Sequence, residues 1–354
     1  MDRYELRRLD YSLTEDHTDL QAAYRQFFKT HCDIETVRAA EPAGFDKSLW
    51  ERLCAMGATT MGLPESVGGD GATLVDLTLV AEELGRTLAP VPWIDHVVGS
   101  RLLARLGALD SAEIVAGTQI VAIDPQQVSP SGPRLIPAGA IADHVVVRDG
   151  EGDGAVVLLT FASRPAKVDN IGKLPMAWVD PALADSRTVL ATGDQALAEY
   201  QRALDEWRLL TASALVGLVE ETMTIAAEFA KTRYTLGVPI STLQGISHPL
   251  ANIAITVQGG RGLCRRAAWF LDNEPDERPE LAPSAFVFMA EEASKAATMA
   301  VHIQGGLGVS AEAAATAYLV RARGWALAGG DPGATAIHIG RIVADRESRS
   351  AASV

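Results

Sequence analysis

The apolar pattern of the C-terminal part constrains the fold more than any other feature of the chain. After residue 196, side chains recur at alternating spacings of three and four, as in Leu215, Leu218, Thr222, Ile225 and Phe229. A second seam runs from Leu243 to Ala267, and further helices are expected over about 285–303 and 311–327. Antiparallel helices packed in a bundle show this spacing. The sequence therefore predicts a C-terminal four-helix bundle over residues 196–354.

The N-terminal part, residues 1–118, is expected to form a helical domain with turns between the helices. Thr14 is a plausible helix start, and another helix is expected from about Thr73 to Gly85. On that second helix the apolar residues share one face, while Glu82 and Glu83 lie on the other. The loop at 64–71 is rich in glycine and acidic residues, which end any regular element.

The middle of the chain has a different pattern. Short runs rich in β-branched residues occur at 119–124, 144–148 and 155–161, and Gly/Pro clusters at 129–133 and 149–154 separate them. They predict a small, shortened β domain over residues 119–195, with Trp178 in its core. The fold class expected is thus mainly α with a small β domain between two helical parts.

Composition excludes several functions. The net charge of −14 opposes binding to nucleic acid. The densest basic group, Arg261, Arg265 and Arg266, is interpreted as a solvated helix face. The three cysteines are far apart and show neither a disulfide framework nor a metal-binding spacing. The charged N-terminus is not a signal peptide, and no window of about eighteen apolar residues was found. We expect a cytoplasmic protein without a metal or a membrane span.

Three local segments, in this order, resemble the acyl-CoA dehydrogenase family. Residues 61–71 (MGLPESVGGDG), followed by EELG at 82–85, are similar to the family's N-terminal loop and helix. Residues 233–240 (RYTLGVPI), with LQGI at 243–246, resemble its Arg-x-x-Phe-Gly-x-x-Ile and Phe-Gln-x-Ile segment. Residues 302–310 (HIQGGLGVS) resemble its Gln-x-x-Gly-Gly-x-Gly stretch. The domain order is also that of the family.

In that family the second and third segments bind the adenosine diphosphate end of an FAD held mainly by a neighbouring subunit. The resemblance implies these cofactor-binding residues: Arg233, Thr235, Leu236, Gly237, Gln244, His302, Gln304, Gly305 and Gly306. An arginine fork suits pyrophosphate oxygens, and glycines allow close backbone approach. From the residues alone, a helix-end arginine is more often a cap or a surface ion pair, and a Gly-Gly pair between two helices is more often a turn.

The sequence also departs from the family. Leu236 stands for the usual Phe, and His302 for the usual Gln. The middle domain lacks the Thr-Glu-Pro-x-x-Gly-Ser-Asp and Trp-Ile-Thr motifs that contact the flavin ring in relatives holding their own flavin. The FAD is therefore expected to be shared across a subunit interface.

The family's catalytic base is missing from both usual positions. Where the resemblance implies Glu-Gly-Thr, residues 329–333 are GGDPG, so that Asp331 is a weak candidate base. The alternative position, directly before Arg208, holds Trp207, and Glu206 lies one residue earlier. No Gly-Lys-Ser/Thr follows the glycines, so the stretch is not a phosphate-binding loop.

These features predict a subunit of an FAD-dependent enzyme that desaturates an acyl-CoA thioester. The favoured role is the non-catalytic partner in a heterotetramer with a second acyl-CoA dehydrogenase-like chain, of the type used in actinobacterial steroid breakdown. Two alternatives stay open. One is a self-sufficient homotetramer whose base is Asp331 or Glu206, and the other is a flavin-free structural homologue.

Overall fold

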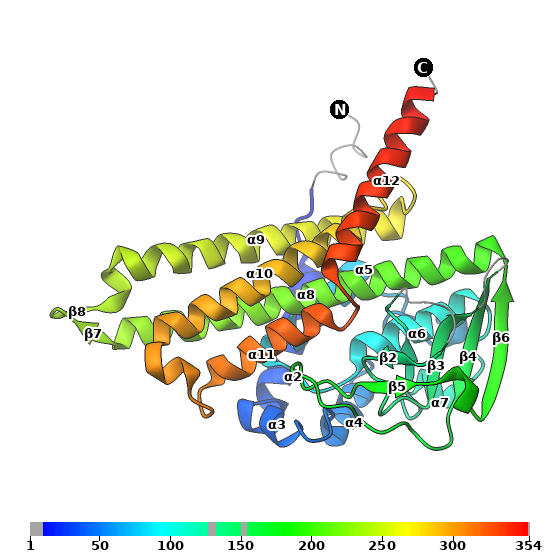
Figure 1. The fold of residues 1–354 in the computed structure, drawn as a ribbon, viewed down its shortest axis with the longest axis horizontal. Helices are drawn as coiled ribbons and strands as arrows, with labels where there is room; N and C mark the ends of the chain where they lie inside the picture. Colours follow the sequence, from blue (N-terminus) through cyan, green and yellow to red (C-terminus); the bar gives the residue numbers. More distant parts are fainter. Residues whose placement is uncertain (1–9, 127–131, 150–153, 353–354) are drawn as a thin grey trace.

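The computed structural model describes residues 10–126, 132–149 and 154–352. The first nine residues lie outside this range, as does most of the two Gly/Pro clusters expected at 129–133 and 149–154. Within the described residues the fold is mainly α with a small β domain, as expected. Helices of the N-terminal part lie beside the long bundle helices, and the β domain packs at one end of both (Figure 1).

The N-terminal part is helical as predicted. Thr14 caps the first described helix through a capping box with His17, and Thr73 caps α5 in the same way with Asp76. The helices are α2 (Glu15–His31), α3 (Ile34–Ala39), α4 (Lys47–Ala55), α5 (Leu74–Thr87), α6 (Trp93–Arg105) and α7 (Ala112–Val115).

Glu82 and Glu83 correct one prediction, because both are buried. Helix α5 lies between α2 and the bundle helix α8 (Asp194–Thr232), so neither of its long faces is free. Glu83 accepts hydrogen bonds from Arg25 at 2.8 Å and from Arg86 at 2.9 Å. Glu82 pairs with Arg261, which is therefore a half-buried ion-pair partner and not part of a solvated face. Because these carboxylates are paired with arginines, α5 has the sequence pattern of a surface helix although its charged face is buried.

The β domain contains a four-stranded sheet of order β1-β3-β4-β6 and a separate pair β2-β5. The predicted strands appear as β1, β3 and β4, whereas β2, β5 and β6 were missed. Strand β1 runs parallel to β3, and the other neighbours are antiparallel. The strands are β1 (Val121–Ile123), β2 (Arg134–Ile136), β3 (His144–Asp149), β4 (Ala155–Thr160), β5 (Ala177–Val179) and β6 (Ser186–Thr192).

Trp178 is not a core residue, contrary to the prediction. Alternation along β5 buries Ala177 and Val179 and turns Trp178 outward, leaving it 56% exposed. An aromatic residue between apolar neighbours is compatible with either face of a strand, and only the register decides.

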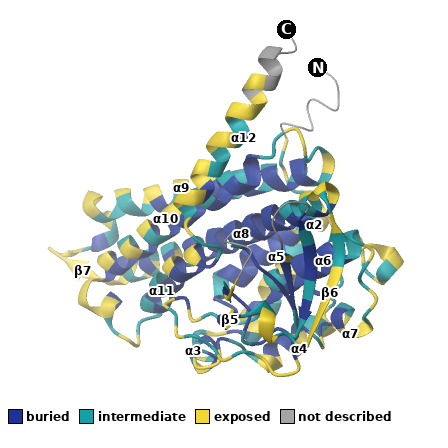
Figure 2. Ribbon diagram, turned by 45° about the vertical axis from the view of Figure 1, so that its right-hand side comes forward, coloured by how far each residue is buried: buried dark blue, intermediate teal, exposed yellow. Residues whose placement is uncertain are grey.

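The C-terminal bundle consists of α8, α9 (Gln244–Asn273), α10 (Leu281–Gln304) and α11 (Ala314–Leu327). A further helix, α12 (Pro332–Ala352), follows and extends beyond the bundle (Figure 1). Residues 332–346 of α12 are largely exposed, in contrast to the buried middle of α8 (Figure 2). The four expected helices are present, and α12 was not anticipated.

Helix α8 bears on the expectation that no apolar window is long enough to cross a membrane. Among the described residues, this is the one helix long and apolar enough to cross a membrane. Its most apolar window is 72% buried inside the protein. Gly217 of α8 and Gly85 of α5 make this burial possible, because a Cβ at either would overlap a backbone carbonyl oxygen of the other helix. We interpret α8 as the central core helix.

Candidate functional site

One candidate site is an open pocket at the end of the bundle where α8 passes into α9. Its walls come from the end of α8, from the hairpin formed by β7 (Tyr234–Thr235) and β8 (Val238–Pro239), and from the end of α10. We call it the hairpin pocket. Its volume is about 460 Å³, and it is lined by Phe229, Arg233, Tyr234, Thr235, Ile240, Ile303, Gln304, Gly305, Gly306 and Leu307.

A small apolar cluster fixes the two sides of this pocket to each other. Ile240 at the foot of the hairpin packs with Ala226 and Ala230 of α8 and with Ala300 and Ile303 of α10. Burying these side chains together holds the hairpin against α10. The arrangement brings Arg233 near Gly305, although about seventy residues separate them in sequence.

The backbone on both sides of the pocket leaves room for a ligand. Gly305 ends α10 with a φ of +61°, a conformation that costs glycine little. A Cβ on Gly305 or Gly306 would meet no atom, so their peptide groups lie open to approach. Within the described part of the chain, the Arg233 guanidinium forms no ion pair, and Arg233 is exposed. The pocket thus presents a free positive charge beside accessible backbone.

The structure gathers some of the predicted cofactor residues and leaves others outside. Arg233, Thr235, Gln304, Gly305 and Gly306 all line the hairpin pocket. The other predicted residues are not among its lining: Leu236, Gly237, Gln244 and His302. The apolar residues of the pocket were not predicted as part of the site. One of them, Phe229, was identified only as a member of the apolar seam of the first bundle helix.

Leu236 and Gly237 form the two-residue turn at the hairpin tip. Leu236 has a φ of +51° and is 89% exposed, and Gly237 has a φ of +79°. A left-handed leucine is unusual, since only glycine, asparagine and aspartate adopt this region readily. Tyr234 beside it is 62% exposed. The hairpin projects from one end of the bundle (Figure 1), and its apolar side chains Tyr234 and Leu236 are exposed there.

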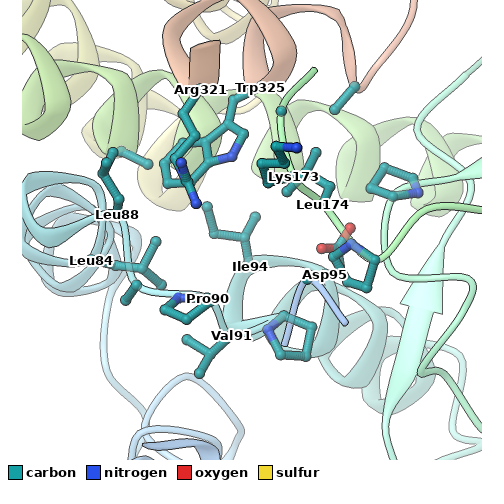
Figure 3. Close-up of a pocket in the computed structure, with 18 of the residues that line it drawn as sticks. Leu84, Leu88, Pro90, Val91, Ile94, Asp95, Lys173, Leu174, Arg321 and Trp325 are labelled. Atoms are coloured by element: carbon teal, nitrogen blue, oxygen red, sulfur yellow. The ribbon is translucent and has the colours of Figure 1, made fainter. Parts of the chain in front are cut away.

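The second candidate site is a narrow cleft in the middle of the molecule, which we call the central cleft. It lies among α5, the start of α6, the 172–175 loop of the β domain, and α8 and α11 (Figure 3). Its walls are mostly apolar, and the cavity is about 70 Å³. Leu84, Ile94, Leu174 and Trp325 lie around it, with Arg321 on one side and Asp95 on another (Figure 3).

Trp207 and Asp95 form one of the polar contacts of the central cleft. The Trp207 Nε1–H donates a hydrogen bond to Asp95 Oδ1 at 3.0 Å. Burial raises the pKa of Asp95 to about 6, although the hydrogen bond from Trp207 opposes that rise. Arg321 is buried and pairs with Glu41 at 3.2 Å.

The two carboxylates considered as bases lie elsewhere. Asp331 is exposed and does not line the cleft, and its Oδ1 accepts a hydrogen bond from the Gly333 N–H at 2.9 Å. That contact sits at the start of α12, where Pro332 is the first residue. The stretch 328–331 is a turn between α11 and α12.

Glu206 is fully buried in an ion-pair network. Arg101 lies 3.0 Å and Arg105 2.8 Å from its carboxylate oxygens. Burial alone would raise the pKa of Glu206, but these two positive charges outweigh it and lower the pKa to about 2. Glu206 does not line the central cleft.

The sequence matches two family models. Residues 14–111 match the acyl-CoA dehydrogenase N-terminal domain, and residues 197–345 match the acyl-CoA dehydrogenase C-terminal domain. Among curated relatives, the acyl-CoA dehydrogenase IpdE2 of Mycolicibacterium smegmatis is 28% identical over 90% of this chain and 96% of its own length. FadE27 of Mycobacterium tuberculosis is 28% identical over 95% and 99%.

Solved structures give the same picture of the fold. The ChsE4-ChsE5 complex of Mycobacterium tuberculosis superposes with a TM-score of 0.80 at 25% identity, covering 95% of this chain and 99% of the matched one. The Tcur3481-Tcur3483 steroid ACAD G363A variant gives a TM-score of 0.82 at 24% identity, covering 94% and 99%.

Proposed function

Because the chain belongs to the acyl-CoA dehydrogenase family, we propose that it is the non-catalytic subunit of a heteromeric acyl-CoA dehydrogenase. In this role it supplies cross-subunit contacts to an FAD whose ring lies in the partner chain. The reaction is the α,β-desaturation of an acyl-CoA thioester. FAD, when bound, supplies the acceptor for the β hydride.

One observation carries the proposal: the hairpin pocket is formed while the central cleft is nearly closed. Ligand pockets typically measure about 300–1,000 Å³. The hairpin pocket, at about 460 Å³, lies within that range and is lined by five of the predicted cofactor residues, whereas the central cleft, at about 70 Å³, lies below the range. This contrast favours a chain that helps to bind a cofactor at its edge and does not hold a flavin ring and a substrate itself.

The hairpin pocket fits the adenosine diphosphate end of FAD. The Arg233 guanidinium can donate two parallel hydrogen bonds to pyrophosphate oxygens. The open backbone at Gly305 and Gly306 accommodates a flat or a charged group closely. Thr235 and Gln304 add a hydroxyl and an amide. Of the predicted residues outside the lining, Leu236 and Gly237 are assigned to contact with the partner chain, while Gln244 and His302 remain proposed cofactor contacts.

A self-sufficient enzyme is less well supported, because neither candidate carboxylate is placed as a base. A general base needs a pKa near the working pH and access to the substrate. Glu206 has a pKa of about 2 and is enclosed by arginines. Asp331 is exposed at the start of α12, outside the central cleft.

The heteromeric assembly and its substrate class rest on relatives. Two of the similar structures are complexes of two named chains, and one is described as a steroid acyl-CoA dehydrogenase. We propose an α2β2 assembly in the cytoplasm acting on an acyl-CoA of the steroid type. The domain division at 118/119 and 195/196 is part of the same proposal.

The test of this function is the flavin content of the complex after Arg233→Ala. Loss of a charge-assisted bidentate contact costs about 2 kcal/mol or more, so FAD affinity should fall about 30-fold. Absorbance near 450 nm relative to protein, followed during dialysis, measures this. Arg323→Ala is the matched control, because Arg323 is an exposed arginine that does not line the hairpin pocket. Equal FAD retention in both variants would remove Arg233 from the cofactor site.

A further inference from the structure

Trp207 occupies the one place in the central cleft where α6, α8 and the 328–331 turn meet. Its indole is 3% exposed and is fixed at two points. The ring nitrogen donates to Asp95 of α6, and the ring lies 6.0 Å from that of Phe286 of α10. Because the indole has both a hydrogen-bond partner and a ring partner, its orientation is fixed.

Gly329 is shaped to receive this indole. A Cβ at residue 329 would lie 2.5 Å from Cζ3 and 3.0 Å from Cη2 of Trp207. A Cβ essentially never lies as close as 2.5 Å to a non-bonded heavy atom, so with any other residue at 329 the tryptophan ring must shift. A very large residue at one position and the smallest at the other therefore form a complementary pair.

A second close approach lies beside the cleft, where Gly172 is one of the lining residues. A Cβ on Gly324 of α11 would lie 2.1 Å from the Gly172 Cα, so the β-domain loop rests directly on the bundle helix. The cavity that remains in the cleft is about 70 Å³. The indole is the largest single group that fills the cleft from the α8 side.

We propose that the Trp207 indole keeps an acyl thioester out of the central cleft, and that Gly329 leaves the space that the indole needs. The inference rests on the proposed function, because exclusion matters only in a chain that leaves the reaction to its partner. It also explains why residue 329 is a glycine in the stretch where the family resemblance implies Glu-Gly-Thr.

The first experiment is a double-mutant cycle on the full chain, or on its complex if a partner co-purifies. Gly329→Ala should lower the midpoint of thermal unfolding by several degrees while Trp207 is present. In the Trp207→Ala background, the same substitution should shift the midpoint little, because the colliding ring is gone. Equal shifts in both backgrounds would refute the complementary pair.

The second experiment asks whether the indole excludes ligands. Indole and hexanoyl-CoA are titrated calorimetrically into the native protein, the Trp207→Ala variant and the Trp178→Ala variant. Trp178 is exposed, so its removal controls for the loss of a tryptophan without creating a cavity. We expect Trp207→Ala alone to bind one molecule of each probe per copy of this chain at a new site. The affinity of that site should be at least tenfold higher than any binding of the same probe by the native protein.

Three results would overturn the proposal. The native protein could bind hexanoyl-CoA at this chain as tightly as the variant does. The variant could bind indole but not hexanoyl-CoA, which would assign exclusion to the 172–175 loop. If the alanine variant does not fold, Trp207→Leu is tested in its place, and it could show no gain in the binding of either probe. The flavin test changes Arg233 and none of the residues of the central cleft. Failure of the proposed function can therefore be distinguished from failure of this inference.

Discussion

At the scale of single residues, the exposed carboxylate of Asp331 and the buried one of Glu206 have opposite environments. Asp331 forms a local contact with the Gly333 N–H, whereas Glu206 is the centre of a network with Arg101 and Arg105. The sequence placed both near the family's two base positions, but it could not show burial or partners. Long-range ion pairs connect α6 to α8 across about one hundred residues, and no local pattern encodes them.

Asp331→Asn is expected to leave the activity of the reconstituted complex unchanged. Losing a general base costs roughly 10²–10⁴-fold, whereas the amide keeps an oxygen that can still accept from Gly333. The isolated chain is expected to show no acyl-CoA dehydrogenase activity with an artificial electron acceptor. Loss of turnover in the asparagine variant, with FAD and acyl-CoA still bound, would make Asp331 the base of a self-sufficient enzyme.

Glu206→Gln is expected to destabilise the fold by about 3–5 kcal/mol at pH 7, because it leaves buried arginine charges uncompensated. The pKa of Glu206 lies at about 2 in the folded chain, below its ordinary value of 4.5. Its stabilising effect is therefore complete above pH 4.5 and is lost as the pH falls toward 2. Urea unfolding at a series of pH values should show this loss in the native chain and a smaller slope in the variant.

At the scale of elements, the crossing of α5 and α8 organises the core. Gly217 of α8 lies so close to α5 that a Cβ would be 1.8 Å from the Glu82 carbonyl oxygen. Helix periodicity predicted both helices, but it did not predict which small residues would mark their crossing. Strand β6 was missed for a different reason. Its apolar run, Val189–Ala191, stands between polar residues, and most of the strand is exposed, whereas the valines of β3 are buried.

Gly217→Ala is expected to lower the free energy of unfolding by at least about 2 kcal/mol, since the two backbones must separate. Gly262→Ala on α9 is the matched control, because a Cβ there meets no atom within 4 Å. It replaces a helical glycine on an open face and should stabilise the chain by up to about 1 kcal/mol. Chemical denaturation of both variants distinguishes close packing from helix propensity.

At the scale of the whole molecule, the apolar hairpin and the open hairpin pocket lie at the same end of the bundle (Figure 1). The motif resemblance predicted the residues on both sides of that pocket. It did not predict the narrow central cleft. The Gly172–Gly324 contact depends on how the β domain meets the bundle, and the Trp207–Gly329 contact depends on how the 328–331 turn lies against α8. Exposed apolar side chains such as Leu236 and Tyr234 are expected to lie in a subunit interface.

The central claim is tested most directly by the FAD stoichiometry of the complex that this chain forms. The chain is expressed with the acyl-CoA dehydrogenase-like chain that co-purifies with it, and the mass of the assembly is measured by light scattering. FAD is then released and quantified against each chain. Our account predicts an assembly of two copies of each chain with one FAD for every pair of unlike chains. A homomeric assembly, or one FAD bound per copy of every chain, would contradict it.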